Sequence, residues 1–199
     1  MRWGIFRFPL VFLALIAIAP ASKAGQPAAL APLKSDMLDG SRLVLREAGC
    51  SVDVPATGWK WMTYEGAGKN YICKSPATEL FLVAVGQLHG EFTDHQPESL
   101  IANARRTMIA RGGKIENEKF EWVEFPGPKK CVRVTFNEID KSGAKTLAVI
   151  YIAQTIEQVS VKLQYTGSAA SEPDVFNKMV HSLKMLSDSG AAATKASGK

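Results

Sequence analysis

Four consecutive segments in the second half of the chain alternate apolar and polar residues, and only short polar turns separate them. The segments are rich in β-branched and aromatic residues, which favour extended strands. Connections this short cannot carry a parallel crossover, so the four strands must form an antiparallel meander. They are residues 114–125, 129–139, 145–155 and 159–166. This pattern limits the chain to folds that are built on an antiparallel sheet.

Further alternating segments precede the meander, and two segments have a helical period instead. The additional strands are predicted at residues 42–47, 50–54, 70–75 and 80–88. Apolar residues of 97–111 share one helical face, and Gly112-Gly113 ends that helix. A second helix is predicted over residues 172–186, with Ser171 as its N-cap. Helices with one apolar face must cover the sheet, so the predicted fold class is α+β, an α/β/α sandwich.

The N-terminus has the pattern of a secretory signal peptide. Arg2 and Arg7 precede an apolar run over residues 8–19, and small residues lead to a cleavage site after Ala24. The run has about a dozen residues, short of the roughly 20 that are needed to span a bilayer. We therefore expect residues 1–24 to be removed, and the mature protein to be periplasmic or secreted without a membrane anchor.

The rest of the chain suits a single domain. Residues 25–36 are rich in Pro and Ala, and residues 188–199 are small and polar. We therefore predict a flexible linker, a domain over residues 37–187 and a disordered tail. A domain of this size buries a sufficient core without a cofactor, and we expect none.

The charge balance argues against nucleic acid as a partner. The signal peptide holds three of the 24 basic residues and none of the 19 acidic ones, so its removal reduces the net charge from +5 to +2. Nucleic-acid binding needs a clustered basic patch on the folded domain, and a basic leader does not provide one.

The sequence contains no motif of a known enzyme class. It lacks a G-x-S-x-G nucleophile elbow, a C-x-x-C redox pair and a haem attachment motif. Gly68-Lys69 resembles part of a P-loop, but Thr63 and Asn70 stand where that loop needs a glycine and a hydroxyl. We therefore expect a non-enzymatic accessory or protein-binding domain of the bacterial cell envelope, whose partner and oligomeric state the sequence does not identify.

The stretch "LHGEFTDH" at residues 88–95 is dense in residue types that bind metals. A catalytic zinc site needs three convergent ligands, and here the two histidines lie six apart across a predicted strand-to-helix corner. Thr93 or Asp94 would serve as an N-cap acceptor there, and Gln96 lies three residues after Thr93. The alternative function is a small metal-binding protein or metal-dependent hydrolase centred on His89, Glu91, Asp94 and His95.

Three cysteines are an odd number for an oxidising compartment. If the strands of Cys50 and Cys73 pair antiparallel, the alternation of faces places their side chains opposite or diagonal to each other. A disulfide there would contribute roughly 3 kcal/mol. In the alternative, both are small buried hydrophobes that never bond. Cys131 falls on the opposite strand face from Val132 and Val134, under a helix or in solvent, and is the candidate free thiol.

A cluster of aromatic residues is the candidate binding surface. Trp59 and Trp61 would share one face of an extended strand, and Tyr64 follows them. Exposed, the pair could stack on a sugar ring or anchor a protein interface. Buried, it would cover one end of the core. A second group forms either a solvated helix face or a basic rim for an acidic partner, and consists of Arg105, Arg106, Arg111 and Lys114.

The order and spacing of these elements resemble the PsbP-like superfamily. The matching features are "AGCSVDVPATGW", an alternating strand, a helix ending in Gly-Gly, and "VSVKLQYTGSAASEPDVFNKMVHSLKML". That superfamily includes the PsbP subunit of photosystem II, a yeast nuclear-import factor that binds Ran, and DcrB-like bacterial envelope proteins. The resemblance covers residues 41–186, although Cys50 stands where the pattern usually has an aromatic residue. It implies an antiparallel sheet between helices in a domain that binds other proteins, and it transfers no site residue.

Overall fold

The computed structural model of the protein describes residues 30–32, 38–39, 41–55, 60–66, 68–74 and 79–186. Side chains are described for residues 41–55 and 79–186. The predicted signal peptide and the predicted C-terminal tail lie outside the described residues.

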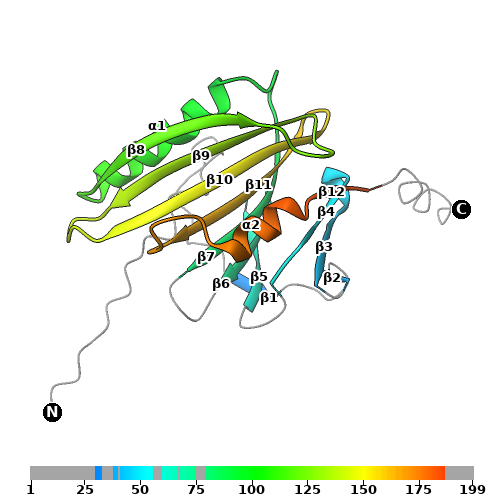
Figure 1. Ribbon diagram of the computed structural model, residues 1–199, viewed down its shortest axis with the longest axis horizontal. Helices are drawn as coiled ribbons and strands as arrows, with labels where there is room; N and C mark the ends of the chain where they lie inside the picture. Colours follow the sequence, from blue (N-terminus) through cyan, green and yellow to red (C-terminus); the bar gives the residue numbers. More distant parts are fainter. Residues whose placement is uncertain are drawn as a thin grey trace, which may run out of the picture.

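The largest element in the described part of the chain is an antiparallel sheet of eight strands, in the order β1-β5-β6-β7-β11-β10-β9-β8. The predicted meander is confirmed, because β8 to β11 are neighbours in chain order (Figure 1). Two strands were not predicted: β5, and β1, which lies inside the predicted linker 25–36 and gives part of it a fixed structure. The strands are β1 (Leu30–Pro32), β5 (Lys60–Gly66), β6 (Gly68–Lys74), β7 (Leu80–Gln87), β8 (Lys114–Val123), β9 (Lys130–Ile139), β10 (Lys145–Ile156) and β11 (Val159–Gly167).

Strand β10 is buried on both faces, and its alternating side chains enter two separate cores. The first core lies on one face of the sheet and receives Val149, Tyr151 and Ala153. The second core lies on the opposite face and receives Ala148, Ile150 and Ile152. The prediction of a sheet between two layers is therefore confirmed, and each layer supplies one core.

Helix α1 (His95–Ala110) covers the second core, as its apolar face predicted, and packs on β8 and β9. Its buried residues are Pro97, Leu100, Ile101, Ala104 and Met108. The Gly112-Gly113 ending is confirmed, since Gly112 has a φ of 76° and the Gly113 N–H donates to the Met108 carbonyl at 2.8 Å. A Cβ on Gly113 would lie 2.4 Å from the Ile139 carbonyl oxygen, so only glycine allows the helix end to approach β9 this closely.

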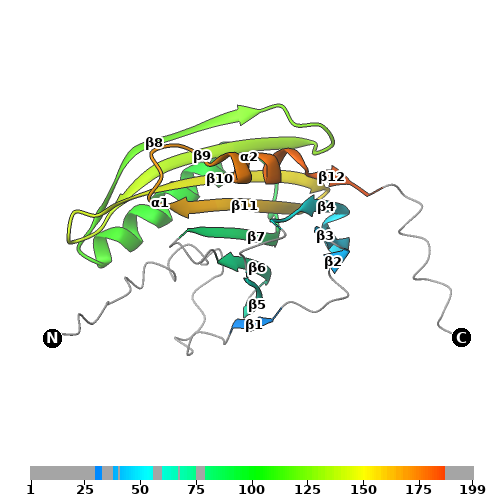
Figure 2. The same ribbon diagram turned by 60° about the horizontal axis from the view of Figure 1, so that its bottom comes forward.

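The first core is covered by helix α2 (Asp174–His181) and a second, smaller antiparallel sheet. That sheet has the order β12-β4-β3-β2 and includes a 3₁₀ turn. Figures 1 and 2 show α2 and this sheet on the face of the large sheet that α1 leaves open. The small sheet and its turn consist of β2 (Leu38–Asp39), β3 (Arg42–Leu45), η3 (Arg46–Ala48), β4 (Cys50–Asp53) and β12 (Lys184–Met185).

Aromatic rings attach α2 to the large sheet. The Phe176 ring lies 5.5 Å from Phe81, 6.1 Å from Tyr151 and 5.9 Å from Tyr165, measured between centroids. All three pairs are tilted, which is a favourable arrangement for aromatic rings. This ring cluster joins the helix to strands β7, β10 and β11.

The prediction that the second helix extends over residues 172–186 was wrong at both ends. The helix starts after Pro173, so Ser171 is not the N-cap. It stops at His181 because the Ser182 hydroxyl accepts a hydrogen bond from the Asp53 N–H at 2.7 Å. The next residues then pair with β4 as β12. A contact with a strand that lies 129 residues away in the chain therefore overrides the local helical period.

Strand β8 forms one outer edge of the large sheet and is interrupted by a β-bulge between Glu116 and Lys119. Asn117 adopts a φ of 55° within the bulge. A bulge and alternating charges both hinder pairing of an exposed edge with another chain. Two of the four residues of the predicted basic group form ion pairs here, since Arg105 pairs with Glu118, and Lys114 with Glu116 at 2.5 Å.

A buried carboxyl group lies under the C-terminal end of α1. Glu138 is 4% exposed, and its Oε2 has no hydrogen-bond partner among the described residues. Burial raises the pKa of Glu138 from 4.5 to about 7, although the charge of the nearby Arg111 lowers it. The folded protein therefore keeps a proton that the unfolded chain releases between these two pH values.

The free energy of unfolding should consequently fall as the pH rises from about 4.5 to about 7. The Glu138→Gln variant cannot ionise, and we expect it to be more stable than the parent at pH 8 by up to about 3 kcal/mol. The two proteins should differ little at pH 4.5. Urea denaturation at both pH values measures this difference. The control is Glu98→Gln, which removes an exposed carboxyl group. If the difference in free energy of unfolding between Glu138→Gln and the parent is the same at both pH values, the burial of Glu138 does not cause the pH dependence.

Candidate functional site

The predicted aromatic surface lies at the side of the sheet far from β8. Trp61 and Tyr64 belong to β5, where Trp61 pairs with Cys73 and Tyr64 pairs with Leu30 of β1. Their side chains and the whole of Trp59 lie outside the described part of the chain. The role of these three residues therefore stays a prediction.

The strand pairing that we expected for Cys50 and Cys73 was wrong. Cys50 lies in the small sheet opposite Leu45 and Met185, whereas Cys73 lies in the large sheet. The pairing failed because residues 60–66 form a strand of their own that pairs with β6. Cys50 is a free thiol in the structure, and the Cys73 side chain lies outside the described residues, so the disulfide itself stays a prediction.

Cys131 is also a free thiol and is buried in the first core. Val132 and Val134 enter the second core, so Cys131 lies on the opposite face from them, and of the two expected environments it has the buried one and not solvent. Burial raises the pKa of both the Cys50 and the Cys131 thiol to about 12. Neither is prepared for nucleophilic chemistry, because the thiolate is the reactive form.

The "LHGEFTDH" stretch forms the corner between β7 and α1. The Thr93 N–H donates to the Gln96 side-chain oxygen at 2.7 Å, which is one half of the predicted capping box. The four candidate metal ligands are all exposed, and they are His89, Glu91, Asp94 and His95. Among the side chains that the structure describes, no three His, Cys, Asp or Glu residues form a group that could hold a metal ion.

Asp94, one of the two predicted N-cap acceptors, stands at the N-cap position of α1 but does not cap the helix with its side chain. Its carboxylate makes no capping hydrogen bond and instead accepts the indole N–H of Trp122 at 2.8 Å. Trp122 also packs edge-on against the buried ring of Phe92, with 5.3 Å between centroids and an angle of 85°. The indole is therefore held on two sides while 43% of the residue stays exposed.

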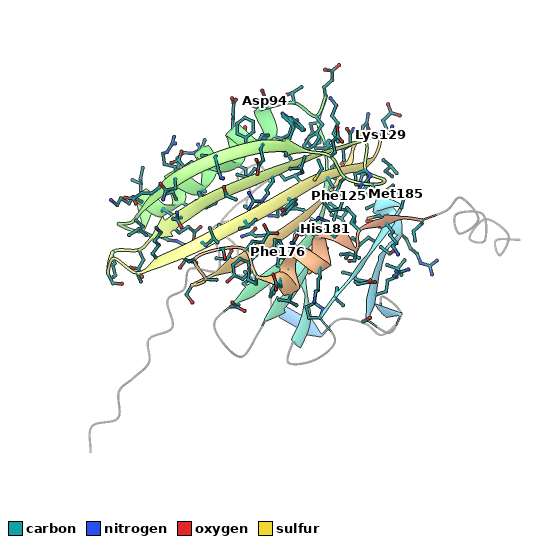
Figure 3. All side chains as sticks on the ribbon, viewed as in Figure 1. Asp94, Phe125, Lys129, Phe176, His181 and Met185 are labelled. Atoms are coloured by element: carbon teal, nitrogen blue, oxygen red, sulfur yellow. The ribbon has the colours of Figure 1, made fainter. Side chains whose placement is uncertain are left out.

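Trp122 borders an open cleft of about 670 Å³ at the turn between β8 and β9. A cleft of this volume is large enough for a small ligand. Figure 3 shows Phe125 and Lys129 at this end of the molecule, close to His181 and Met185. The residues that border the cleft include Trp122, Glu124, Phe125, Pro128, Lys129 and Lys130.

The turn that forms the cleft is fixed from below. Phe125 packs against the His181 ring at 5.3 Å and against the Tyr151 ring at 6.4 Å. Gly127 has a φ of 105°, and a Cβ there would lie 3.0 Å from the Met185 side chain. The Lys129 N–H donates to the Gln154 carbonyl at 2.8 Å. These contacts give the cleft a preformed shape.

Charged groups of both signs surround the cleft. Glu124, Lys129 and Lys130 line it, and the Asp94 carboxylate lies at the edge of Trp122. The Lys130 ammonium donates to the Phe92 carbonyl oxygen at 3.2 Å. Two carboxylates and two ammonium groups thus balance one another around one exposed aromatic side chain.

Exposed apolar side chains gather at the same end of the sheet. Ile156 is 38% exposed and Leu186 is 37% exposed, and both lie beside Gly49. They are two of the five large hydrophobic residues that are exposed among the described side chains. We call Ile156 and Leu186 the turn-end surface, because the β8–β9 and β10–β11 turns lie near β12 at this end (Figure 1).

A second charged cluster is saturated by its own contacts. Arg133 pairs with Glu121 at 2.9 Å and with Glu172 at 3.1 Å, and the Tyr151 hydroxyl lies 3.3 Å from the Glu172 carboxylate. Burial and the charge of Glu172 raise the pKa of Tyr151 to about 12. The cluster attaches the segment before α2 to the sheet.

Comparison with known proteins rests on the fold. No protein-family model matches the sequence, and no curated protein matches it significantly. The solution structure of PsbP (CyanoP) from Synechocystis sp. PCC 6803 is similar, with a TM-score of 0.56 at 12% identity over 84% of this chain and 98% of that one. The chain has a PsbP-like fold.

A second solved structure shares this fold. It is a crystal structure from Bacteroides thetaiotaomicron, with a TM-score of 0.50 and 13% identity over 76% of this chain. This chain spans about half the length of that protein, since the match covers 50% of it. Among the described residues of the PsbP-like domain, no helix has the length and hydropathy to cross a membrane.

Trp122 is the residue of the candidate site that sequence reasoning missed. It sits in "KFEWVEF", where alternation predicts only a strand position. The sequence did offer one signal, a lone tryptophan among charged residues on the strand that follows α1. Its partner Asp94 lies 28 residues away, and no local pattern links the two.

Removing the Asp94 acceptor should loosen Trp122. We expect Asp94→Ala to lower the free energy of unfolding by about 1 kcal/mol, because the indole N–H loses a charged acceptor. Asp94→Asn keeps an acceptor oxygen and should lose less. Urea denaturation measures both variants. Glu91→Ala removes an exposed carboxylate of the same loop and should change stability by less than about 0.5 kcal/mol. If Asp94→Ala and Glu91→Ala lower the free energy of unfolding equally, the hydrogen bond to Trp122 does not stabilise the fold.

Proposed function

We propose that the chain is an exported, non-enzymatic accessory protein of the bacterial cell envelope that binds a protein partner through its turn-end surface. The observation that carries this proposal is the pair of exposed large hydrophobic side chains, Ile156 and Leu186, that lie beside Gly49 at one end of the sheet. Apolar side chains that group on a surface favour a protein interface, whereas single ones are common on any protein. The preformed cleft beside them would let a partner dock without reordering the turn.

The export part of the proposal is supported by the N-terminal pattern. A basic start, a short apolar run and small residues before Gly25 are typical of a cleaved leader. The buried thiols of Cys50 and Cys131 suit an oxidising compartment, because burial protects them from exchange.

The surface around Trp59, Trp61 and Tyr64 is a second candidate contact. Strand β5 lies at the opposite side of the large sheet from β8. A partner that used both surfaces would have to span the sheet, so we propose that only one of them is the main contact. The variants below separate the two.

A partner that is crosslinked in the native envelope should depend on the turn-end surface. We expect the Leu186→Asp and Ile156→Ser variants each to reduce the yield of one specific crosslinked product about tenfold, because interface energy is concentrated in few apolar residues. Photo-crosslinking followed by mass spectrometry gives the yield. Ile109→Asp is the matched control, since Ile109 is 62% exposed on α1, away from the turns.

Three outcomes of that experiment are decisive. Loss in the two turn-end variants but not in Ile109→Asp supports the proposal. Loss only in Trp59→Ala and Trp61→Ala moves the contact to the β5 side of the sheet. An unchanged product in all variants, each shown by circular dichroism to be folded, contradicts a protein interface at both places.

Protein purified from its native envelope should have an intact mass that begins at Gly25. Native alkylation should leave the Cys50 and Cys131 thiols unmodified, because both are buried, and denaturation should expose them. A Cys50–Cys73 bridge would instead protect both of these cysteines after denaturation and leave only Cys131 to react. A full-length mass that begins at Met1 in a cytoplasmic fraction would overturn the export proposal.

A further inference from the structure

We propose that the cleft at the β8–β9 turn binds a neutral saccharide whose ring stacks on Trp122. This site goes beyond the proposed function and does not depend on it, since it requires neither export nor a protein partner. Three features of the cleft lead to it: a fixed aromatic platform, a balanced set of charged groups, and a preformed volume.

The indole of Trp122 is arranged as a platform. Its polar N–H is already occupied by the Asp94 carboxylate, so the rest of the ring system offers an apolar surface to a ligand. Phe92 and Asp94 hold the ring in place, and stacking therefore costs little conformational freedom. One face of a pyranose ring carries mainly C–H groups, and these suit contact with an aromatic surface.

The charges around the platform favour a neutral ligand with many hydroxyl groups. An anion would meet Glu124 and Asp94, and a cation would meet Lys129 and Lys130. Carboxylates only accept hydrogen bonds and ammonium groups only donate them, whereas a hydroxyl group does both. Sugar hydroxyls can therefore be satisfied by every charged group at the cleft.

The volume and the stiffness of the cleft fit this ligand. About 670 Å³ lies within the range of 300 to 1,000 Å³ that small-ligand sites occupy, so one or two sugar rings can enter. The Phe125–His181 contact and the approach of Gly127 to Met185 fix the turn before the ligand arrives. Binding is therefore not opposed by the ordering of a loop.

The test uses the indole N–H resonance of Trp122 in ¹⁵N-labelled mature protein, assigned with Trp122→Phe. The probes are the methyl glycosides of glucose, galactose and mannose, and N-acetylglucosamine. Two charged relatives of the same ring, glucosamine and glucuronate, and the open-chain polyol sorbitol complete the set. We expect at least one neutral sugar to give a saturable shift with a Kd on the order of millimolar, and the charged sugars and sorbitol to bind at least about tenfold more weakly.

Variants locate the binding. Trp122→Ala should abolish the saturable shift of the backbone resonances of residues 123–131, and Glu124→Gln should weaken it about fivefold through the loss of a charged acceptor. Glu98→Gln on α1 should leave it unchanged. The proposal is overturned if glucosamine or glucuronate binds more tightly than every neutral sugar, or if no sugar saturates below about 100 mM. It is also overturned if binding survives in a folded Trp122→Ala protein.

These outcomes are independent of the partner experiment. Partner docking is tested at Ile156 and Leu186, and saccharide binding at Trp122 and Glu124. If the Ile156 and Leu186 variants lose the crosslinked partner and no sugar binds, the proposed function stands and the saccharide site is refuted.

Discussion

The burial of β10 on both faces is the constraint on which the rest of the structure depends. Its side chains enter the α1 core and the α2 core in alternation, so neither helix layer can shift without disturbing the strand that both layers share. Close-packed interiors transmit such strain because they contain little free volume. The Phe176 ring packs against Tyr151 of this strand, and the turn of the small sheet contacts it where Gly49 meets Ile156.

Local patterns were enough to predict most of the fold. Alternation located β7 to β11 and predicted the antiparallel order of β8 to β11, and the helical period located α1 together with its Gly-Gly ending. Prediction failed where pairing is non-local. Ser182 contacts Asp53 across 129 residues and ends α2, and β12 then joins β4, which no helical period can indicate. Strand β5 was missed because Trp61 and Tyr64 were interpreted, with Trp59, as a surface cluster and not as part of a strand.

The candidate site was less predictable than the fold. Sequence reasoning found the loop at residues 88–95 and its capping pair of Thr93 and Gln96, since both are local. It assigned Asp94 to the same cap, but the carboxylate binds Trp122 from another element. Whether an exposed aromatic residue can form part of a binding site depends on the groups that fix its ring. For Trp122 these groups come together only when the sheet and α1 pack. The PsbP-like fold was recognised from the order of elements, which says nothing about these contacts.

The bulge at Asn117 has a consequence for how binding by this domain can evolve. It interrupts the regular backbone of the outermost strand, so pairing of that edge with a strand of another protein is disfavoured. Such backbone pairing would also discriminate poorly between partner sequences. Recognition is left to side chains at the turns, where positions 124–128 lie outside the strands. Lineages that inherit this scaffold could therefore exchange one ligand for another through a few surface substitutions, while the two cores stay intact.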